Sequence, residues 1–164
     1  MRGYSIIDGM NMRVYELVKV QHPQYSQGDF RIAKEEDLKI VSTWIYSIEK
    51  DEGSDITYEK AYDMAKNKIN DGQLYLWEDK VAVSMACISR PTINGIVVNM
   101  VYTPPELRGR GYASSCVASL SQYLLNIGYK FCSLFTDLSN PTSNSIYIKI
   151  GYKPICDYKS YSFK

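Results

Sequence analysis

The most informative segment of this chain is Asn99-Met-Val-Tyr-Thr-Pro-Pro-Glu-Leu-Arg-Gly-Arg-Gly-Tyr-Ala-Ser-Ser115. It starts as the end of an apolar run, turns at Pro104-Pro105 and becomes helical after Gly111, so it predicts a strand, a loop and a helix in succession. The first turn of a helix has backbone N–H groups without partners, and the aligned peptide dipoles make that end partially positive. The stretch therefore predicts an amide-rich, positive helix end directly after a strand.

Two glycines and two arginines occur where this loop meets the helix. Gly109 and Gly111 have no Cβ, so an anion can approach their backbone closely. Arg108 and Arg110 add guanidinium groups whose forked donors suit phosphate oxygens. A tight turn with two solvated arginines is the alternative interpretation, but alternating glycine and arginine is less common at a helix entry. We favour a phosphate site that is neither a Walker loop nor a dinucleotide fingerprint, because the spacing of both motifs is absent.

The length and charge of the chain limit its function class. A chain of 164 residues, 45% of them apolar, suits one globular domain with a substantial core. The formal net charge of +1 argues against a general nucleic-acid-binding surface or a polybasic membrane module. No segment has the length of a membrane-spanning helix, and the start of the sequence lacks a signal-peptide pattern. We expect a soluble, cytoplasmic protein with no nucleic-acid and no membrane partner.

The sequence does not favour metal or cysteine chemistry. The four cysteines are scattered among apolar residues without a Cys-x-x-Cys pair, and the single histidine, His22, lies in a polar segment. Cys87, Cys116, Cys132 and Cys156 are predicted to be buried, reduced thiols. We therefore predict no metal site and no disulfide framework.

The chain divides into an N-terminal arm with a linker, residues 1–29, and a main domain, residues 30–164. The arm carries a strand candidate at residues 12–20, whose partner is not visible in the sequence. In the main domain, helices are predicted at 35–51, 57–70, 112–127 and 140–150, and strands at 30–33, 73–77, 81–89, 96–102, 131–136, 152–156 and 158–163. This order predicts an α/β fold with a mixed sheet and helices on both faces.

Two motifs resemble those of a known family. Arg108-Gly-Arg-Gly-Tyr-Ala113 is similar to the Gln/Arg-x-x-Gly-x-Gly/Ala signature of the GCN5-related N-acetyltransferases. Asn144-Ser-Ile-Tyr-Ile-Lys-Ile-Gly-Tyr152 resembles their second motif, Asn-x-x-Tyr-x-Lys-x-Gly-Phe/Tyr, which precedes a late strand. The predicted order of elements agrees with that fold from residue 30 onward, roughly four-fifths of the chain. The resemblance implies the acyl-CoA N-acyltransferase fold, with a central, mostly antiparallel sheet.

The resemblance also implies an enzyme that binds acetyl-CoA and transfers its acetyl group to a primary amine of a small molecule or peptide. Backbone N–H groups of the loop and helix start would hold the CoA diphosphate, and the preceding strand would pair with the pantetheine arm. That strand and the one at 131–136 would splay apart and leave a slot for the thioester. The residues implied in cofactor binding are Met100, Val101, Tyr102, Arg108, Gly109, Arg110, Gly111, Tyr112, Ala113, Ser114, Asn140 and Asn144.

Tyr147 is the catalytic residue that the resemblance implies. Its hydroxyl would point at the sulfur and donate a proton to the departing thiolate as a general acid. Backbone N–H groups near Val101 or Tyr102 would stabilise the negative charge that develops on the carbonyl oxygen. Position alone, on an apolar helix face with Ile146 and Ile150, favours a core tyrosine, whereas the surrounding motif favours the acid.

The chain departs from the family at the general base. Many members place a glutamate on the strand before the loop, but residues 95–101 contain no acid here. Asn99 could position a water, and Glu106 in the following loop suits a solvated turn residue better than a base. Carboxylates that could line the acceptor side, or simply lie on the surface, follow at the end of the first predicted helix: Glu49, Asp51 and Glu52. No base is assigned, and a catalytically silent CoA-binding regulatory module stays the alternative function. A nucleotide-phosphate protein outside the family is a third hypothesis.

The N-terminal strand is a second departure. Some relatives carry two such folds in tandem, and the strand at 12–20 resembles the tail of a missing first copy. Such a strand would dock on the sheet and leave an uncovered surface suited to self-association, so a homodimer is a further hypothesis.

Overall fold

The computed structural model describes residues 6–163, and within that range seven strands form one sheet. The strands are β1 (Ile6–Leu17), β2 (Asp29–Ile32), β3 (Leu74–Asp79), β4 (Val81–Ser89), β5 (Gly95–Tyr102), β6 (Phe131–Asp137) and β7 (Lys153–Phe163). They lie in the order β2-β3-β4-β5-β6-β1-β7, and all neighbouring pairs are antiparallel except β5 with β6. The predicted α/β class with a mixed, mostly antiparallel sheet is confirmed.

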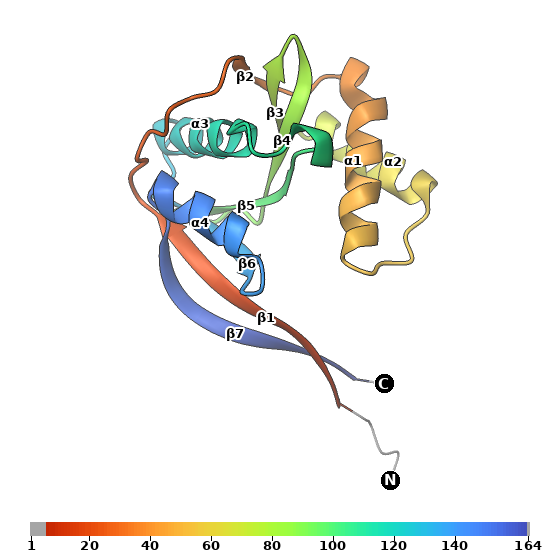
Figure 1. Cartoon of the computed structure of the whole chain (residues 1–164), viewed down its shortest axis with the longest axis vertical. Coiled ribbons are helices and arrows are strands. Elements are labelled where there is room, and N and C mark those ends of the chain that lie inside the picture. Colours follow the sequence, from red (N-terminus) through yellow and green to blue (C-terminus); the bar gives the residue numbers. More distant parts are fainter. Residues whose placement is uncertain (1–5, 164) are drawn as a thin grey trace.

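Helices cover both faces of the sheet (Figure 1). They are α1 (Leu38–Asp51), α2 (Tyr58–Asn70), α3 (Tyr112–Asn126) and α4 (Pro141–Ile150), with short 3-10 helices η1 (Glu35–Asp37) and η2 (Pro105–Leu107). Buried side chains of α3 and α4 share one apolar core with β1 and β6, whereas those of α1 and α2 form a second core on β3 and β4. No helix within residues 6–163 is long and apolar enough to cross a membrane.

Two side-chain caps and one C-terminal glycine set helix limits where the sequence predicts them. Thr57 Oγ1 accepts a hydrogen bond from the backbone N–H of Lys60 at the start of α2. Asn140 Oδ1 accepts one from the backbone N–H of Ser143 at the start of α4. α4 then stops at Gly151, which takes a left-handed φ of 109°. These three boundaries are confirmed.

α1 starts three residues later than predicted, because the acids before it form η1. The Asp37 carboxylate accepts hydrogen bonds from Nη1 and Nη2 of Arg31 on β2, at 2.7 and 2.9 Å. Arg31 also pairs with Glu78 on β3. Asp37 therefore ties the helix entry to the sheet instead of lying in the first turn of the helix.

β1 lies inside the sheet, between β6 and β7 (Figure 1). It begins at Ile6 instead of residue 12, and its residues 12–17 pair with β6. The partner that the sequence left unidentified is therefore the sheet of the same chain. Beyond β6, β1 and β7 continue together as a twisted two-stranded ribbon away from the body (Figure 1).

The two C-terminal strands predicted at 152–156 and 158–163 are one strand, β7. Asp157 does not interrupt it, because the ladder with β1 runs unbroken from Tyr158 to Cys156. The Asp157 carboxylate also accepts hydrogen bonds from Nε and Nη2 of Arg13 on β1, at 2.6 and 2.8 Å. Cys156 lies on this edge strand and is exposed, so its predicted burial is wrong. The other three cysteines are buried as predicted.

Candidate active site

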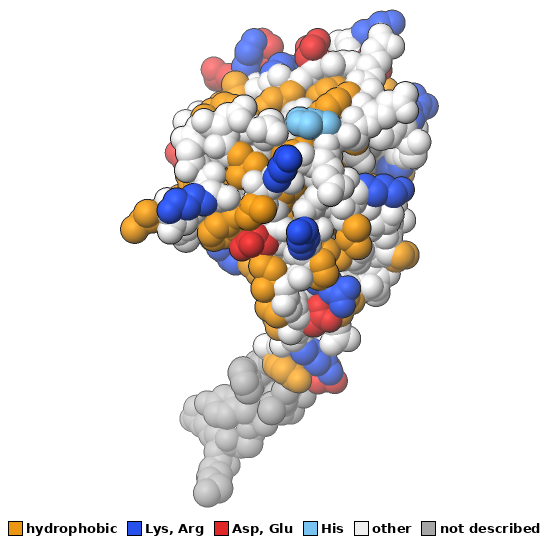
Figure 2. All heavy atoms as spheres, turned by 90° about the vertical axis from the view of Figure 1, so that its left-hand side faces the viewer, with side chains coloured by type: hydrophobic (Ala, Val, Ile, Leu, Met, Phe, Trp, Pro, Cys, Tyr) orange, Lys and Arg blue, Asp and Glu red, His pale blue; other side chains and the backbone are white. Residues whose placement is uncertain are grey.

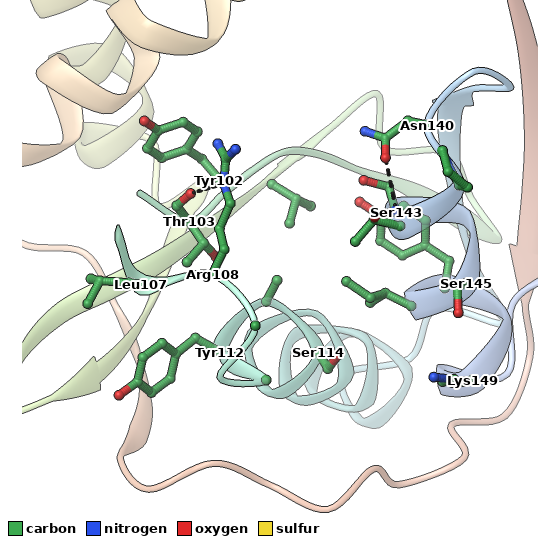
Figure 3. Close-up of a pocket in the computed structure, with 18 of the residues that line it drawn as sticks. Tyr102, Thr103, Leu107, Arg108, Tyr112, Ser114, Asn140, Ser143, Ser145 and Lys149 are labelled. Atoms are coloured by element: carbon green, nitrogen blue, oxygen red, sulfur yellow. Dashed lines mark hydrogen bonds between the residues drawn. The ribbon is translucent and has the colours of Figure 1, made fainter. Parts of the chain in front are cut away.

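A cleft of about 1030 Å³ lies where the end of β5, the start of α3, one side of α4 and the end of α1 meet. The short parallel pairing of β5 with β6 explains the opening, because within the described residues it joins only 95–97 to 131–133 and the two strands are not paired with each other beyond it. Both strands run on past these pairs, to Tyr102 and Asp137. Figure 3 shows the loop and α3 on one side of the cleft and α4 on the other.

A β-bulge near the end of β5 sets which of its residues face the cleft. Between the pairs that Asn99 and Tyr102 make with β4, β5 has two residues where β4 has one, and Met100 takes a positive φ of 48°. The extra residue reverses the alternation of side chains: Val101 packs against the core under α3 and α4, and Tyr102 against the core under α1 and α2. Val101 and Tyr102 line the cleft, whereas Met100 does not.

The loop between β5 and α3 leaves backbone N–H groups without partners at the cleft wall. Gly109 and Gly111 take positive φ values of 77° and 79°, and both line the cleft. No side chain caps α3, and within residues 6–163 no hydrogen bond comes from the backbone N–H of Gly109, Gly111, Ala113 or Ser114. Together with the dipole of α3, these groups make this wall electropositive.

The two arginines of the loop lie in different places. Arg108 lines the cleft: its Nε donates to the Thr103 carbonyl at 2.9 Å, and its guanidinium carbon is 5.9 Å from the ring centre of Tyr102 (Figure 3). Arg110 is exposed and does not line the cleft, and its carbonyl accepts a hydrogen bond from the Ser26 hydroxyl. Of the two predicted phosphate ligands, the structure brings Arg108 to the site.

Tyr147 lies on the facing wall, on α4. Its side chain is only 8% exposed, it lines the cleft, and its ring packs edge-on against Tyr152 with centroids 6.0 Å apart. Burial raises the pKa of its hydroxyl, so the group is protonated at neutral pH. Among the described residues this hydroxyl has no hydrogen-bond partner, so its proton is available to a group in the cleft.

Asn144 lies just behind this wall, and its side-chain amide makes hydrogen bonds to other residues of the chain. Its Oδ1 accepts from the hydroxyls of Tyr15 at 2.8 Å and Thr136 at 2.6 Å. Its Nδ2 donates to the carbonyls of Asp137 at 3.1 Å and Asn140 at 2.7 Å. The side chain thus joins β1, β6 and the start of α4, and it lines a smaller neighbouring hollow instead of the cleft.

Two carboxylates line the other end of the cleft, at the C-terminus of α1. Asp51 and Glu52 are both there, whereas Glu49 and Glu106 are not among the lining residues. Burial, and then the neighbouring charge of Glu49, raises the pKa of Glu52. Asn99 lies away from the cleft, with its Nδ2 on Ser89 Oγ at 3.1 Å. The cleft therefore has an electropositive end and an acidic end.

The structure brings most of the predicted site residues to this one cleft, and their roles in binding stay predictions. Those that line it are Val101, Tyr102, Arg108, Gly109, Gly111, Tyr112, Ala113, Ser114, Asn140 and Tyr147. Those that do not are Met100, Arg110 and Asn144. Sequence reasoning missed Thr103, Leu107, Ser143, Ser145 and Lys149, which also line it. Ser143 had a usable signal, because it precedes Tyr147 by four residues and so shares its helix face.

Sequence comparison matches residues 76–161 to a family described as FR47-like protein. No curated protein matches the chain. Among solved structures, a GNAT-family acetyltransferase from Colwellia psychrerythraea matches with a TM-score of 0.78 at 15% identity, over 96% of this chain and 57% of that one. This chain therefore spans little more than half the length of that protein.

Two shorter neighbours were solved with a bound ligand. A predicted acetyltransferase from Clostridium acetobutylicum with acetyl-CoA has a TM-score of 0.58 at 18% identity, over 76% of this chain and 89% of that one. An aminoglycoside N-acetyltransferase in complex with CoA has a TM-score of 0.65 at 15% identity, over 80% of this chain and 91% of that one. These similarities establish a shared fold.

Proposed function

The chain belongs to the FR47-like family and, with it, to the GCN5-related N-acetyltransferases, and on this premise we propose that it transfers the acetyl group of acetyl-CoA to a primary amine. The acceptor would be a small molecule or a peptide, and its nitrogen would attack the thioester directly. The observation that carries the proposal is the pairing of an uncapped helix end on one wall of the cleft with the buried Tyr147 hydroxyl on the other.

The electropositive wall suits the diphosphate of CoA. Backbone N–H groups from Gly109 to Ser114 would donate to its oxygens, as anions commonly bind at helix N-termini. The two left-handed glycines let that backbone be approached closely, and the Arg108 guanidinium lies beside it. The cleft, at about 1030 Å³, is at the upper end of the roughly 300–1,000 Å³ of ordinary ligand pockets, as a long cosubstrate requires.

Acetyl-CoA supplies an acetyl group activated as a thioester, and Tyr147 would act on the departing sulfur. Its protonated hydroxyl would donate to the thiolate as a general acid. Backbone N–H groups at the bulge of β5, near Val101 and Tyr102, would stabilise negative charge on the carbonyl oxygen.

The acidic end would receive the amine. Asp51 and Glu52 carry negative charge at the C-terminus of α1, where the helix dipole is also negative, so a second positive charge on the acceptor is favoured there. Glu52→Gln should raise the KM of a diamine and leave that of an uncharged-tail monoamine unchanged. Because its pKa is raised, the contribution of Glu52 should be lost at a higher pH than that of an ordinary glutamate as the solution is acidified.

Release of CoA thiol tests the proposal directly. The protein is incubated with acetyl-CoA and a panel of monoamines, diamines and peptides, with calorimetry of CoA binding alongside. Amine-dependent thiol release supports the enzyme, whereas CoA binding without release above the hydrolysis blank supports the regulatory module. Tighter binding of ATP than of CoA would overturn both.

We also propose that self-association, where it occurs, uses the edge strand β7. Large apolar side chains that are exposed on its described part include Ile155, Tyr158 and Tyr161. An unpaired sheet edge with such side chains readily pairs with another copy. Sedimentation over a wide range of concentrations tests this, and a monomer throughout would refute the homodimer.

A further inference from the structure

We infer that Ser26, in the linker between β1 and β2, is a positioning residue for the diphosphate-binding loop. Its hydroxyl would hold the peptide group between Arg110 and Gly111 so that the Gly111 N–H points into the cleft. The inference rests on the proposed binding of CoA, and it assigns to the linker a part in the site although no linker residue lines the cleft.

Two hydrogen bonds join the linker to the loop and helix start. Ser26 Oγ donates to the carbonyl oxygen of Arg110 at 2.7 Å. The backbone N–H of Ser26 donates to Ser115 Oγ at 2.9 Å, and that hydroxyl in turn donates to the Gly111 carbonyl at 3.0 Å. The linker therefore fixes the Arg110 carbonyl directly, whereas the Gly111 carbonyl is held by Ser115 of α3, whose backbone N–H also donates to it at 3.0 Å.

Because the peptide group is planar, holding the Arg110 carbonyl also sets the direction of the Gly111 N–H. In a trans peptide group, the C=O of one residue and the N–H of the next point in opposite directions, and no cis peptide is present in the described residues. With the Arg110 carbonyl directed at the linker, the Gly111 N–H must point away from it, and Gly111 lines the cleft. Without the anchor, this peptide group can rotate at little cost, because glycine allows many backbone conformations.

The absence of a side chain at Gly111 is what lets the linker come so close. A Cβ on Gly111 would lie 2.8 Å from Ser26 Oγ, well inside van der Waals contact. A Cβ on Gly109 would meet nothing within 4 Å. Both glycines have a left-handed φ, which disfavours any side chain at either position. At Gly111 the nearby Ser26 hydroxyl also leaves no room for one.

The linker itself is held firmly on either side of Ser26. The Tyr25 ring stacks on Trp77, with centroids 6.2 Å apart and 18° between the planes. The Gln27 carbonyl accepts a hydrogen bond from Trp77 Nε1 at 3.1 Å. The linker runs along the side of the body that faces the viewer in Figure 2, where hydrophobic side chains are interspersed with Lys and Arg. Ser26 is thus presented to the loop by a fixed segment.

The test compares Ser26→Ala with Ser26→Thr, which keeps the hydroxyl, and with Gln24→Ala as an exposed control in the same linker. Calorimetry should give a CoA Kd about three- to tenfold weaker for Ser26→Ala, the value of one hydrogen bond, and near wild type for the other two. Kinetics with acetyl-pantetheine, which has the thioester but no phosphate, should be the same in all four proteins. A merely structural defect would affect both acetyl donors.

Loss of CoA binding and loss of the Ser26 anchor give different results. Failure of the wild-type protein to bind CoA would refute the proposed function itself. If the wild type binds CoA, an affinity of Ser26→Ala within about twofold of it, or an equal loss with acetyl-pantetheine, would refute the positioning role alone. Thermal unfolding of each variant shows whether it is folded at the assay temperature.

Discussion

Replacing Tyr147 with phenylalanine removes one oxygen atom from the cleft wall and should affect turnover and stability in opposite ways. A general acid contributes about 10²–10⁴-fold, so kcat should fall at least about 100-fold, or about 2.7 kcal/mol in the barrier. Its hydroxyl has no partner within residues 6–163 and lies at the wall of the open cleft, so its loss should leave the free energy of unfolding unchanged or slightly higher. CoA affinity should stay the same.

Tyr152→Phe is the matched control, because its ring packs against that of Tyr147 but its hydroxyl is used by the fold. Tyr152 is 1% exposed, and its hydroxyl is 2.8 Å from Ser121 Oγ. The substitution leaves the buried Ser121 hydroxyl without that partner, which should cost about 1–3 kcal/mol. For a chain of this size the melting temperature should fall by about 2–4 °C per kcal/mol, with turnover unchanged.

Thiol release at saturating acetyl-CoA gives kcat for both variants, and circular dichroism gives both melting curves. Tyr147 does not act as a general acid if Tyr147→Phe keeps its turnover number, whatever happens to its stability. The Tyr147 hydroxyl would have a structural partner, and its proton would not be free for catalysis, if Tyr147→Phe melts lower by as much as Tyr152→Phe does.

Three further changes test other parts of the structure. Asn144→Ala removes four hydrogen bonds and should lower the free energy of unfolding in urea by about 2–4 kcal/mol, and a loss below about 1 kcal/mol would contradict its structural role. Arg108→Ala should weaken CoA binding about three- to tenfold in calorimetry, by a factor that shrinks with added salt, and an unchanged Kd would exclude the guanidinium from the site. Burial alone would raise the pKa of Asp37, but the hydrogen bonds from Arg31 and the Lys34 backbone outweigh it and lower that pKa below its ordinary 3.8. The stability it provides is therefore complete above pH 3.8 and is lost as pH falls through the lower value, so Asp37→Asn should flatten the decline of the melting temperature in acid.

Local chemistry made much of the fold predictable. Thr57, Asn140 and Gly151 act through bonds to residues within one turn of their own position, so the sequence alone contains both partners. The glycines of the loop were likewise readable, because a left-handed backbone strongly favours that residue.

Contacts between distant parts of the chain were not predictable in the same way. Arg13 and Asp157 are 144 residues apart, and the pairing of β7 with β1, in which they lie opposite each other, makes one strand of the two predicted ones. The same limit applies to the site: Asn144 fits the motif of a cofactor ligand, but Tyr15 on the N-terminal strand occupies its amide. Ser26 carries no motif, and only the folded linker brings it to Arg110.

The ribbon of β1 and β7 brings the two ends of the described chain together, since Ile6 and Phe163 are opposite each other in the antiparallel ladder. Neighbouring strands lie only about 5 Å apart, so a few added glycines would bridge these ends without strain. A circular permutant opened in the β4–β5 hairpin, where Ile93 is 97% exposed, would then keep every strand pairing of the sheet. In such a molecule β7 and β1 would be consecutive, and the pairing with the largest sequence separation in the native chain would become a local hairpin.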